Sequence, residues 1–182
     1  MKVIGIVGMP ASGKGEVSKI ARDLGIPVVV MGDAIRMQAA RAGLPATDAN
    51  LGAISGELRS ELGMDAIARI TIPLIETAAA PVVLVDGIRG DYEVATFREH
   101  FPDFVLIGIV SSFEARYARL TDRGRSDDAL TAEDLRTRDE RERGWGLLRA
   151  LAQADHTVIN EGTLEEFTGE IRSLLRRLGG TT

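Results

Sequence analysis

A short glycine-rich stretch carries the residues best suited to chemistry in this sequence. Its members are Gly8, Met9, Pro10, Ala11, Ser12, Gly13, Lys14 and Gly15, followed by Glu16. The order glycine, four residues, glycine and lysine is typical of a loop that wraps a polyphosphate. Glycines allow backbone N–H groups to turn toward the anion, and the start of a following helix adds a positive dipole end. Lys14 would then reach the outer phosphates as a mobile charge.

The residues on either side of the loop have the pattern that such a loop requires. An apolar run at residues 2–7 predicts a buried strand, and residues 17–24 place apolar side chains on one helical face. An ordinary strand-to-helix turn that carries a lysine is the structural alternative. Because strand, loop and helix occur in the required order, the sequence predicts a protein that binds a nucleoside triphosphate.

The two positions after Lys14 depart from the general pattern. Gly15 stands where many such loops have the serine or threonine that contacts magnesium, and Glu16 follows it. An acidic side chain here would repel the phosphates unless it points outward or faces a metal ion. The sequence leaves both orientations of Glu16 open.

Two aspartates follow further apolar runs. Asp86 ends the run at residues 81–86, where a carboxylate could hold magnesium directly or through water. Asp33 follows the run at residues 26–31. Both are candidate catalytic and metal-binding residues, and a helix cap or a turn residue is the structural alternative for each.

Arg36 and Arg89 each lie three residues beyond one of these aspartates. Guanidinium groups bind phosphate through two parallel contacts, which suits this pair to the phosphate of a second substrate. A solvated helix face is the alternative for Arg36. Since hydrolysis of a nucleotide alone needs no second phosphate clamp, the pair favours a kinase.

The order of elements that must position these residues predicts an α/β fold. Apolar strand-like runs alternate with helical patterns, at residues 2–7, 26–31, 81–86, 104–110 and 156–160. Strands that are apolar throughout indicate a parallel sheet covered by helices on both faces. Ligands bind such sheets at the carboxyl ends of the strands, where Lys14, Asp33 and Asp86 all fall.

Helices are expected between the strands. Residues 33–80 are predicted to form a helical insertion that binds the acceptor, with Asp48 as a cap, and residues 145–154 a late helix. Capping-box spacing predicts helix starts at Ser111, Thr131 and Thr163. Residues 119–143 are a candidate lid with a polar turn at 124–130. Most lid arginines should be solvated or ion-paired, but those that close over the donor could stabilise the transferring phosphoryl group.

The composition fits one α/β domain over residues 1–182. A net charge of −5 argues against general binding to nucleic acids or membrane surfaces, and no apolar run is long enough to cross a bilayer. The absence of cysteine removes disulfides, thiolate-bound zinc and cysteine nucleophiles. We therefore expect a cytoplasmic protein, with no signal peptide before the first strand.

Taken together, these motifs resemble the adenylate-kinase-like nucleotide kinases. The matching features are Lys14-Gly15, Gly32-Asp33 with Arg36, Asp86-Gly87 with Arg89, Arg119 with Arg123, and Arg125 with Arg136. The resemblance implies that Arg119 and Asn160 contact the donor and that Arg123, Arg125 and Arg136 act in catalysis. Arg89 comes one residue earlier than in adenylate kinase, and Glu16 replaces a threonine that is usual there.

The full length resembles more closely an archaeal family of P-loop kinases, described as related to dephospho-CoA kinase and cytidylate kinase. Five segments carry this likeness, at residues 7–16, 31–36, 86–89, 102–107 and 159–162. Glu16 belongs to that family's pattern. The resemblance implies a three-layer P-loop fold with a five-stranded parallel sheet in the order 2-3-1-4-5, with ATP as donor and Mg²⁺ as cofactor. It assigns no acceptor.

The sequence thus predicts an ATP-dependent kinase of a small phosphate-bearing acceptor, either a nucleoside monophosphate or a nucleotide like dephospho-CoA. The alternative is a regulatory or assembly ATPase that uses the loop as a switch. Arg36, Arg89 and a lid favour the kinase, whereas Glu16 and the missing hydroxyl at Gly15 keep the ATPase open.

Overall fold

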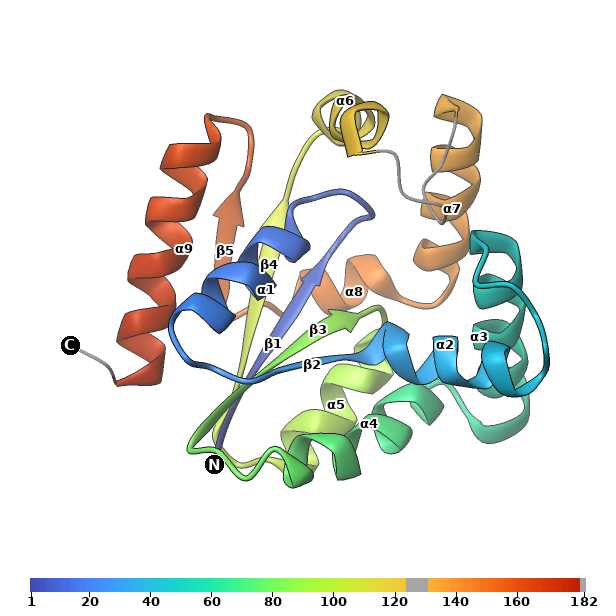
Figure 1. The fold of residues 1–182 in the computed structure, drawn as a ribbon, viewed down its shortest axis with the longest axis horizontal. Coiled ribbons are helices and arrows are strands. Elements are labelled where there is room, and N and C mark those ends of the chain that lie inside the picture. Colours follow the sequence, from blue (N-terminus) through green and yellow to red (C-terminus); the bar gives the residue numbers. More distant parts are fainter. Residues whose placement is uncertain (124–130, 181–182) are drawn as a thin grey trace.

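The protein is built on a five-stranded, all-parallel sheet (Figure 1), seen in a computed structural model that describes residues 1–123 and 131–180. The strands are β1 (Lys2–Gly8), β2 (Val28–Val30), β3 (Val82–Ile88), β4 (Phe104–Val110) and β5 (His156–Ile159). They lie in the order β2-β3-β1-β4-β5, which confirms the predicted topology. Because β1 is the central strand, the loop that follows it lies in the middle of the row formed by the carboxyl ends of the strands.

Helices cover both faces of the sheet. They are α1 (Lys14–Asp23), α2 (Met31–Arg41), α3 (Asp48–Leu62), α4 (Ala66–Thr77), α5 (Asp91–His100), α6 (Phe113–Arg123), α7 (Ala132–Gly144), α8 (Leu147–Leu151) and α9 (Leu164–Gly179). Apolar side chains of α1 and α9 pack on one face, and those of α4, α5 and α8 on the other. In the described part of the chain, no helix is long and apolar enough to span a bilayer.

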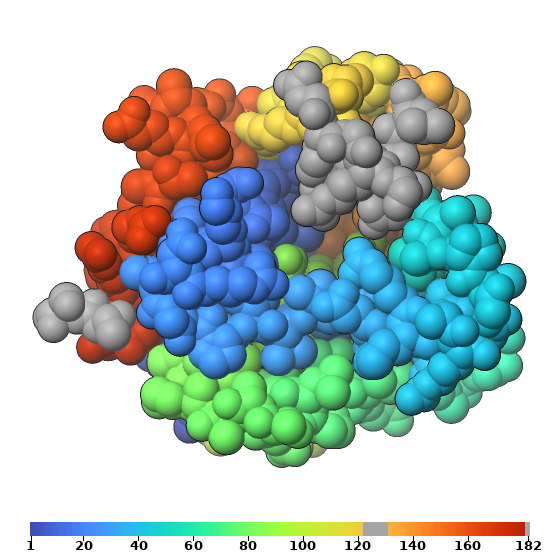
Figure 2. Space-filling view, in the orientation of Figure 1, coloured from blue at the N-terminus to red at the C-terminus, as the bar shows by residue number. Residues whose placement is uncertain are grey.

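Three helices, α2, α3 and α4, lie between β2 and β3. In the space-filling view their surface runs from blue to cyan-green on the side of α1 opposite α9 (Figure 2). Leu51, Ile54 and Leu58 of α3 are partly buried against the core. The apolar face of α3 therefore holds the insertion together against the core, where the insertion can form one wall of a site.

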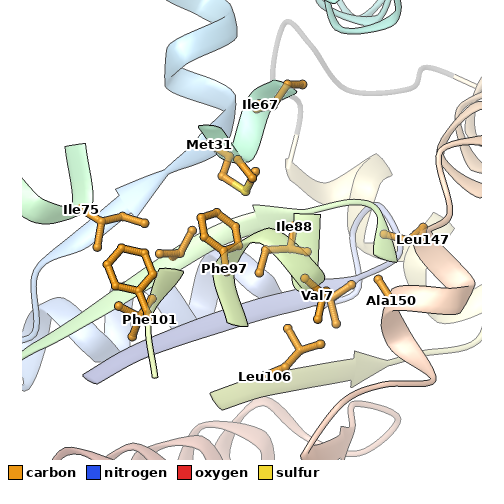
Figure 3. Close-up of a cluster of buried hydrophobic side chains, with 14 of the residues drawn as sticks. Val7, Met31, Ile67, Ile75, Ile88, Phe97, Phe101, Leu106, Leu147 and Ala150 are labelled. Atoms are coloured by element: carbon orange, nitrogen blue, oxygen red, sulfur yellow. The ribbon is translucent and has the colours of Figure 1, made fainter. Parts of the chain in front are cut away.

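The core is divided by the alternation of side chains along the strands. In β1, Ile4 and Ile6 face α1 and α9, whereas Val3 and Val7 face the opposite layer. Phe97 of α5 lies at the centre of that second cluster (Figure 3). Burying a large apolar side chain of this kind stabilises the fold by about 1.5–3 kcal/mol. The sheet is thus a rigid base for the residues at its edge.

The two strands that precede the aspartates have different bounds from those predicted. β2 is limited to Val28–Val30 and α2 begins at Met31, so Asp33 lies in the first turn of a helix. β3 continues beyond Asp86 to Ile88, and Asp86 pairs in register with Ile6 and Val30. Asp86 is therefore held by strands on both sides, whereas Asp33 is held by a helix.

Two of the predicted helix caps and one helix are also corrected. Thr47, not Asp48, caps α3, because its hydroxyl accepts the Asn50 N–H. At the start of α6 the Ser112 hydroxyl accepts the Ala115 N–H, so Ser111 is not the cap. The predicted helix 145–154 is only α8, since Gly146 adopts φ +97° just before it. The capping boxes at Thr131 and Thr163 are confirmed.

Candidate active site

The loop between β1 and α1 has a backbone that a side chain would disturb. Gly13 adopts φ +114°, and a Cβ there would lie 2.4 Å from the Asn160 side-chain nitrogen. That Asn160 nitrogen donates to the Ser12 carbonyl at 2.9 Å. Ser12 itself is buried, and its hydroxyl has no hydrogen-bond partner among the described residues. A buried hydroxyl without a partner in such a loop fits a site whose ligand supplies the missing bond.

Lys14 lies folded over the loop that precedes it. Its ammonium group donates to the carbonyls of Gly8 and Met9, at 2.5 and 2.9 Å. Burial lowers the pKa of Lys14 to about 8, an effect that the carboxylates of Glu142 and Asp86 oppose. The lysine is therefore a partly desolvated cation, and a polyphosphate would be its natural counter-ion.

Asp86 is joined to the first helix through a serine. The Ser18 hydroxyl of α1 donates to Asp86 Oδ2 at 2.7 Å, and Ser18 is buried. Magnesium in nucleotide sites is commonly held by one or two carboxylates together with phosphates and water. No group of three His, Asp or Glu side chains suited to a metal occurs in the described part of the chain. Asp86 therefore fits a magnesium ion that travels with a nucleotide.

Asp33 and Arg36 are paired with each other on the surface of α2. Arg36 Nη1 donates to Asp33 Oδ1 at 2.7 Å, and both side chains are well exposed. Arg36 also lines a pocket of the described chain, whereas Asp33 does not. Of the predicted site residues, Arg36 and Arg89 thus line this pocket, whereas Lys14, Asp33 and Asp86 do not.

That pocket, which we call the arginine pocket, lies between the α2–α3 insertion and α7. Its walls carry five guanidinium groups, from Arg36, Arg59, Arg89, Arg138 and Arg141. They also include the carboxylate of Asp48 and the ring of Trp145. Asp48 accepts two hydrogen bonds from Arg141, both at 2.9 Å, which ties α3 to α7. A pocket with this excess of cations is suited to an anionic ligand.

Glu142 is the buried counter-ion of this pocket. It accepts hydrogen bonds from Arg89 and from Arg138, the latter at 3.2 Å, and its own side chain is only 2% exposed. Burial alone would raise the pKa of Glu142, but Arg89, Arg138 and Lys14 outweigh it and hold that pKa below its usual range. The same carboxylate therefore acts on the loop lysine and on two pocket arginines.

A second buried carboxylate fixes the backbone of Arg89. Glu93 of α5 accepts a hydrogen bond from the Arg89 N–H at 2.7 Å. It also forms an ion pair with Arg59 at 2.6 Å. The Arg59 guanidinium lies 4.3 Å from the centre of the Trp145 ring, close enough for a cation–π contact. Arg89 is consequently held at its main chain by Glu93 and at its side chain by Glu142.

The predicted lid region, residues 119–143, includes the end of α6 and most of α7, and its polar turn at 124–130 lies outside the described residues. Both helices are attached to the phosphate-binding loop. Arg116 of α6 forms a two-point ion pair with Asp139 of α7, at 2.9 and 2.6 Å. Its guanidinium also donates to the Pro10 carbonyl at 3.1 Å. Arg116 and Asp139 are both buried. One buried cation thus fixes α6, α7 and the loop relative to one another.

The arginines singled out from the sequence have different surroundings. Arg119 donates to the Ser111 hydroxyl at 2.8 Å and to the Asn160 carbonyl at 2.7 Å, so it braces the loop after β5. Arg136 is exposed and lies 4.9 Å from the Phe113 ring centre. Arg125 lies outside the described residues, and of Arg123 only its place at the end of α6 is described.

The residues of this site that were not predicted as functional from the sequence include Ser18, Arg59, Glu93, Arg116, Asp139, Arg141 and Glu142. Their contacts join segments far apart in the chain, as Ser18 joins Asp86 and Arg116 joins Asp139. The one available signal was the unusual density of arginine and carboxylate in α7. That density predicts ion pairs, but it does not identify the residues of other elements with which the α7 side chains pair.

Comparison with other proteins places the chain in a family and in a fold. The AAA domain family matches residues 7–136. The "UPF0200 protein" of Methanoculleus marisnigri is 77% identical over 180 residues, which are 99% of this chain and 98% of that protein. The "UPF0200 protein" of Methanoregula boonei is 58% identical over 178 residues, or 98% of each chain.

Solved structures of P-loop kinases share the fold. Shikimate kinase from Bacteroides thetaiotaomicron matches 98% of this chain and 98% of its own, with a TM-score of 0.62 and 15% identity. A gluconokinase from Sinorhizobium meliloti 1021 matches 98% of this chain and 94% of its own, with a TM-score of 0.57 and 20% identity. The resemblance found in the sequence is confirmed: the chain belongs to the archaeal UPF0200 family, whose AAA-type domain has the fold of the P-loop kinases.

Proposed function

We propose that this protein transfers a phosphoryl group from ATP to a small acceptor that itself carries a phosphate. The class includes nucleoside monophosphates and nucleotides similar to dephospho-CoA. The observation that carries the proposal is the arginine pocket, whose cations Arg89 and Arg138 share the buried Glu142 that also acts on Lys14. A pocket for a second anion beside a phosphate-binding lysine is what a kinase needs and a simple ATPase does not.

The loop and the pocket would have separate tasks. Backbone N–H groups of the loop and Lys14 would hold the donor phosphates, and Arg36 and Arg89 would hold the acceptor phosphate. With a monophosphate acceptor, the attacking phosphate oxygen is already ionised at neutral pH and needs no general base. That oxygen forms a new bond to the γ-phosphorus of ATP, the bond from this phosphorus to the β,γ-bridging oxygen breaks, and ADP leaves with the electron pair.

Residues around the loop would support the transfer. Asp86, oriented by Ser18, would hold Mg²⁺, which neutralises charge on the phosphates when it is bound. Glu16 lies in the first turn of α1, where a negative charge stabilises the helix dipole. The proposed lid, residues 119–143, would include the end of α6 and most of α7, and Arg116 joins these two helices to the loop.

The proposal is tested by ADP release in the presence of candidate acceptors. Nucleoside monophosphates, nucleosides and dephospho-CoA would each be added to wild type, Arg36→Ala and Arg89→Ala. Each arginine variant should lose about one to two decades in kcat/KM for the acceptor, with ATP affinity nearly unchanged. Arg172→Ala in α9, where Arg172 Nη2 lies 3.8 Å from Asp23 Oδ2 of α1, is the matched control.

The second candidate is an ATPase that uses the loop as a switch. Gly15, which removes the usual hydroxyl and has open space beside it, is the observation that favours this function. In that case no phosphate-bearing acceptor would stimulate ADP release, and Arg36→Ala and Arg89→Ala would hydrolyse ATP as wild type does. Such a result would overturn the kinase proposal.

A further inference from the structure

The first helix lacks a hydroxyl at the position where phosphate-binding loops usually supply one. Gly15 is the residue directly after Lys14, and no atom lies within 4 Å of a Cβ built there. Its φ is outside the left-handed region, so the backbone itself does not require glycine. The hydroxyl is therefore missing although the site has room for one.

A hydroxyl is present one helical turn further along the same face of α1. Ser18 follows Lys14 by four residues, and side chains with this spacing lie one above the other on a helix. Ser18 is 3% exposed, and its hydroxyl donates to Asp86 Oδ2 at 2.7 Å. The carboxylate of Asp86 also acts on the charge of Lys14. Lys14, Ser18 and Asp86 thus form one cluster beneath the loop.

We propose that Ser18 compensates for the missing loop hydroxyl by positioning Asp86 for the magnesium ion of a bound nucleotide. By donating its proton to Oδ2, Ser18 fixes the plane of the carboxylate and leaves Oδ1 for the hydrated ion. Because it lies a turn deeper than Gly15, Ser18 acts through Asp86 and is not a ligand of the ion. The inference rests on the proposed nucleotide binding but not on phosphoryl transfer to an acceptor.

The test is the effect of magnesium on ADP and ATP affinity, measured by calorimetry with the full chain in Mg²⁺ and in EDTA. In Ser18→Ala, affinity in EDTA should stay within about twofold of wild type, whereas the gain from Mg²⁺ should fall by about tenfold. Thr71→Val is the matched control, since Thr71 is also buried and its hydroxyl bonds only within α4. It should leave the magnesium effect unchanged.

Restoring a hydroxyl at the loop gives a second, independent measurement. The open space at Gly15 should accept Gly15→Ser, and the double variant Gly15→Ser/Ser18→Ala should regain most of the magnesium effect. If Ser18→Ala does not fold, Ser18→Cys, which keeps the shape but donates weakly, should show a reduced magnesium effect.

The outcomes separate this inference from the proposed function. A loss of affinity that is equal in Mg²⁺ and EDTA, or no loss at all, would show that Ser18 only fills the core and would overturn the inference. No recovery in the double variant would overturn the inference that Ser18 compensates for the hydroxyl missing at Gly15. Absence of any acceptor turnover would count against the kinase and leave these binding results unaffected.

Discussion

Lys14 is the residue whose charge state should report on ligand binding. Its pKa of about 8 in the free protein results from burial, which the carboxylates of Glu142 and Asp86 only partly offset. A bound polyphosphate adds negative charge beside the ammonium group and should raise that pKa. Near pH 7 Lys14 is already protonated, whereas near pH 9 it is mostly neutral. ATP binding should therefore be accompanied by proton uptake that increases between pH 7 and 9.

This proton uptake is measurable by calorimetry in buffers of different ionisation enthalpy. Lys14→Met removes the titrating group, so its remaining nucleotide binding should show no proton uptake at either pH.

The lowered pKa of Lys14 also makes the stability of the fold depend on pH. Because the folded pKa lies below the ordinary value of 10.5, the unfolded chain holds more protons between about pH 8 and 10.5. The free energy of unfolding contributed by Lys14 therefore rises with pH in that range.

Single residues of the site could be predicted where a local pattern carries them. Lys14 follows the apolar strand β1 and Asp86 lies near the end of the apolar strand β3, and the sheet topology brings them to one edge. Ser18 and Glu142 could not be found in this way, because a buried serine in an amphipathic helix and one acid in a charged helix have no local mark of function. Their roles depend on partners, Asp86 and Arg89, that lie far away in the sequence.

At the scale of elements, the buried pair Arg116–Asp139 holds two helices and a loop together. Asp139→Ala would leave the Arg116 guanidinium buried without its counter-ion, and breaking such a pair costs about 3–5 kcal/mol. We therefore expect a large fall in the free energy of unfolding, measured by guanidinium denaturation. The double variant Arg116→Met/Asp139→Leu should regain much of this stability, because a buried ion pair can be replaced by apolar side chains.

The same double variant distinguishes stability from function. It lacks the Arg116 contact to the Pro10 carbonyl, so the loop loses a brace even where the fold is recovered. Nucleotide affinity should stay reduced while the unfolding free energy returns toward that of wild type. Wild-type nucleotide affinity in the recovered variant would contradict a role for this pair in positioning the loop.

The elements themselves could be predicted better than their ends. The strands and most helices follow from apolar periodicity, and Thr131 and Thr163 begin helices as their spacing indicates. The end of β2 was misplaced because Met31 is apolar and fits both a strand and a helix. Ser111 and Ser112 are adjacent serines, and only the geometry of the chain decides that Ser112 caps α6.

At the scale of the whole molecule, the arginine pocket is closed by contact between the insertion and α7. Arg141 crosses this gap to Asp48, and a Cβ at Gly52 would lie 2.8 Å from Arg141 Nη1. Gly52→Ala should therefore displace Arg141. Because the clash is with a flexible side chain, the free energy of unfolding should change by no more than about 1 kcal/mol. If the proposed kinase function holds, KM for the acceptor should rise about tenfold with ATP affinity unchanged.

A neighbouring glycine of the same helix provides the control for this prediction. A Cβ at Gly56 of α3 meets no atom within 4 Å, so Gly56→Ala changes helix propensity in the same way without touching Arg141. Steady-state kinetics and calorimetric ATP binding of the two variants should separate them. An equal effect of both variants on the acceptor would show that the helix, and not Arg141, is responsible.

The position of β1 in the sheet has a consequence for how the chain is made. In the centre of the sheet, Lys2 pairs with Val82 and Val3 with Phe104, and at the edges Val28 pairs with Leu84 and Ile107 with His156. Each of these pairings joins distant parts of the chain, and folding through such pairings is slow. During synthesis, β1 and its loop wait without partners until β3 and β4 have left the ribosome. A nascent chain that ends before β3 should therefore not retain ATP, however intact its glycine-rich loop.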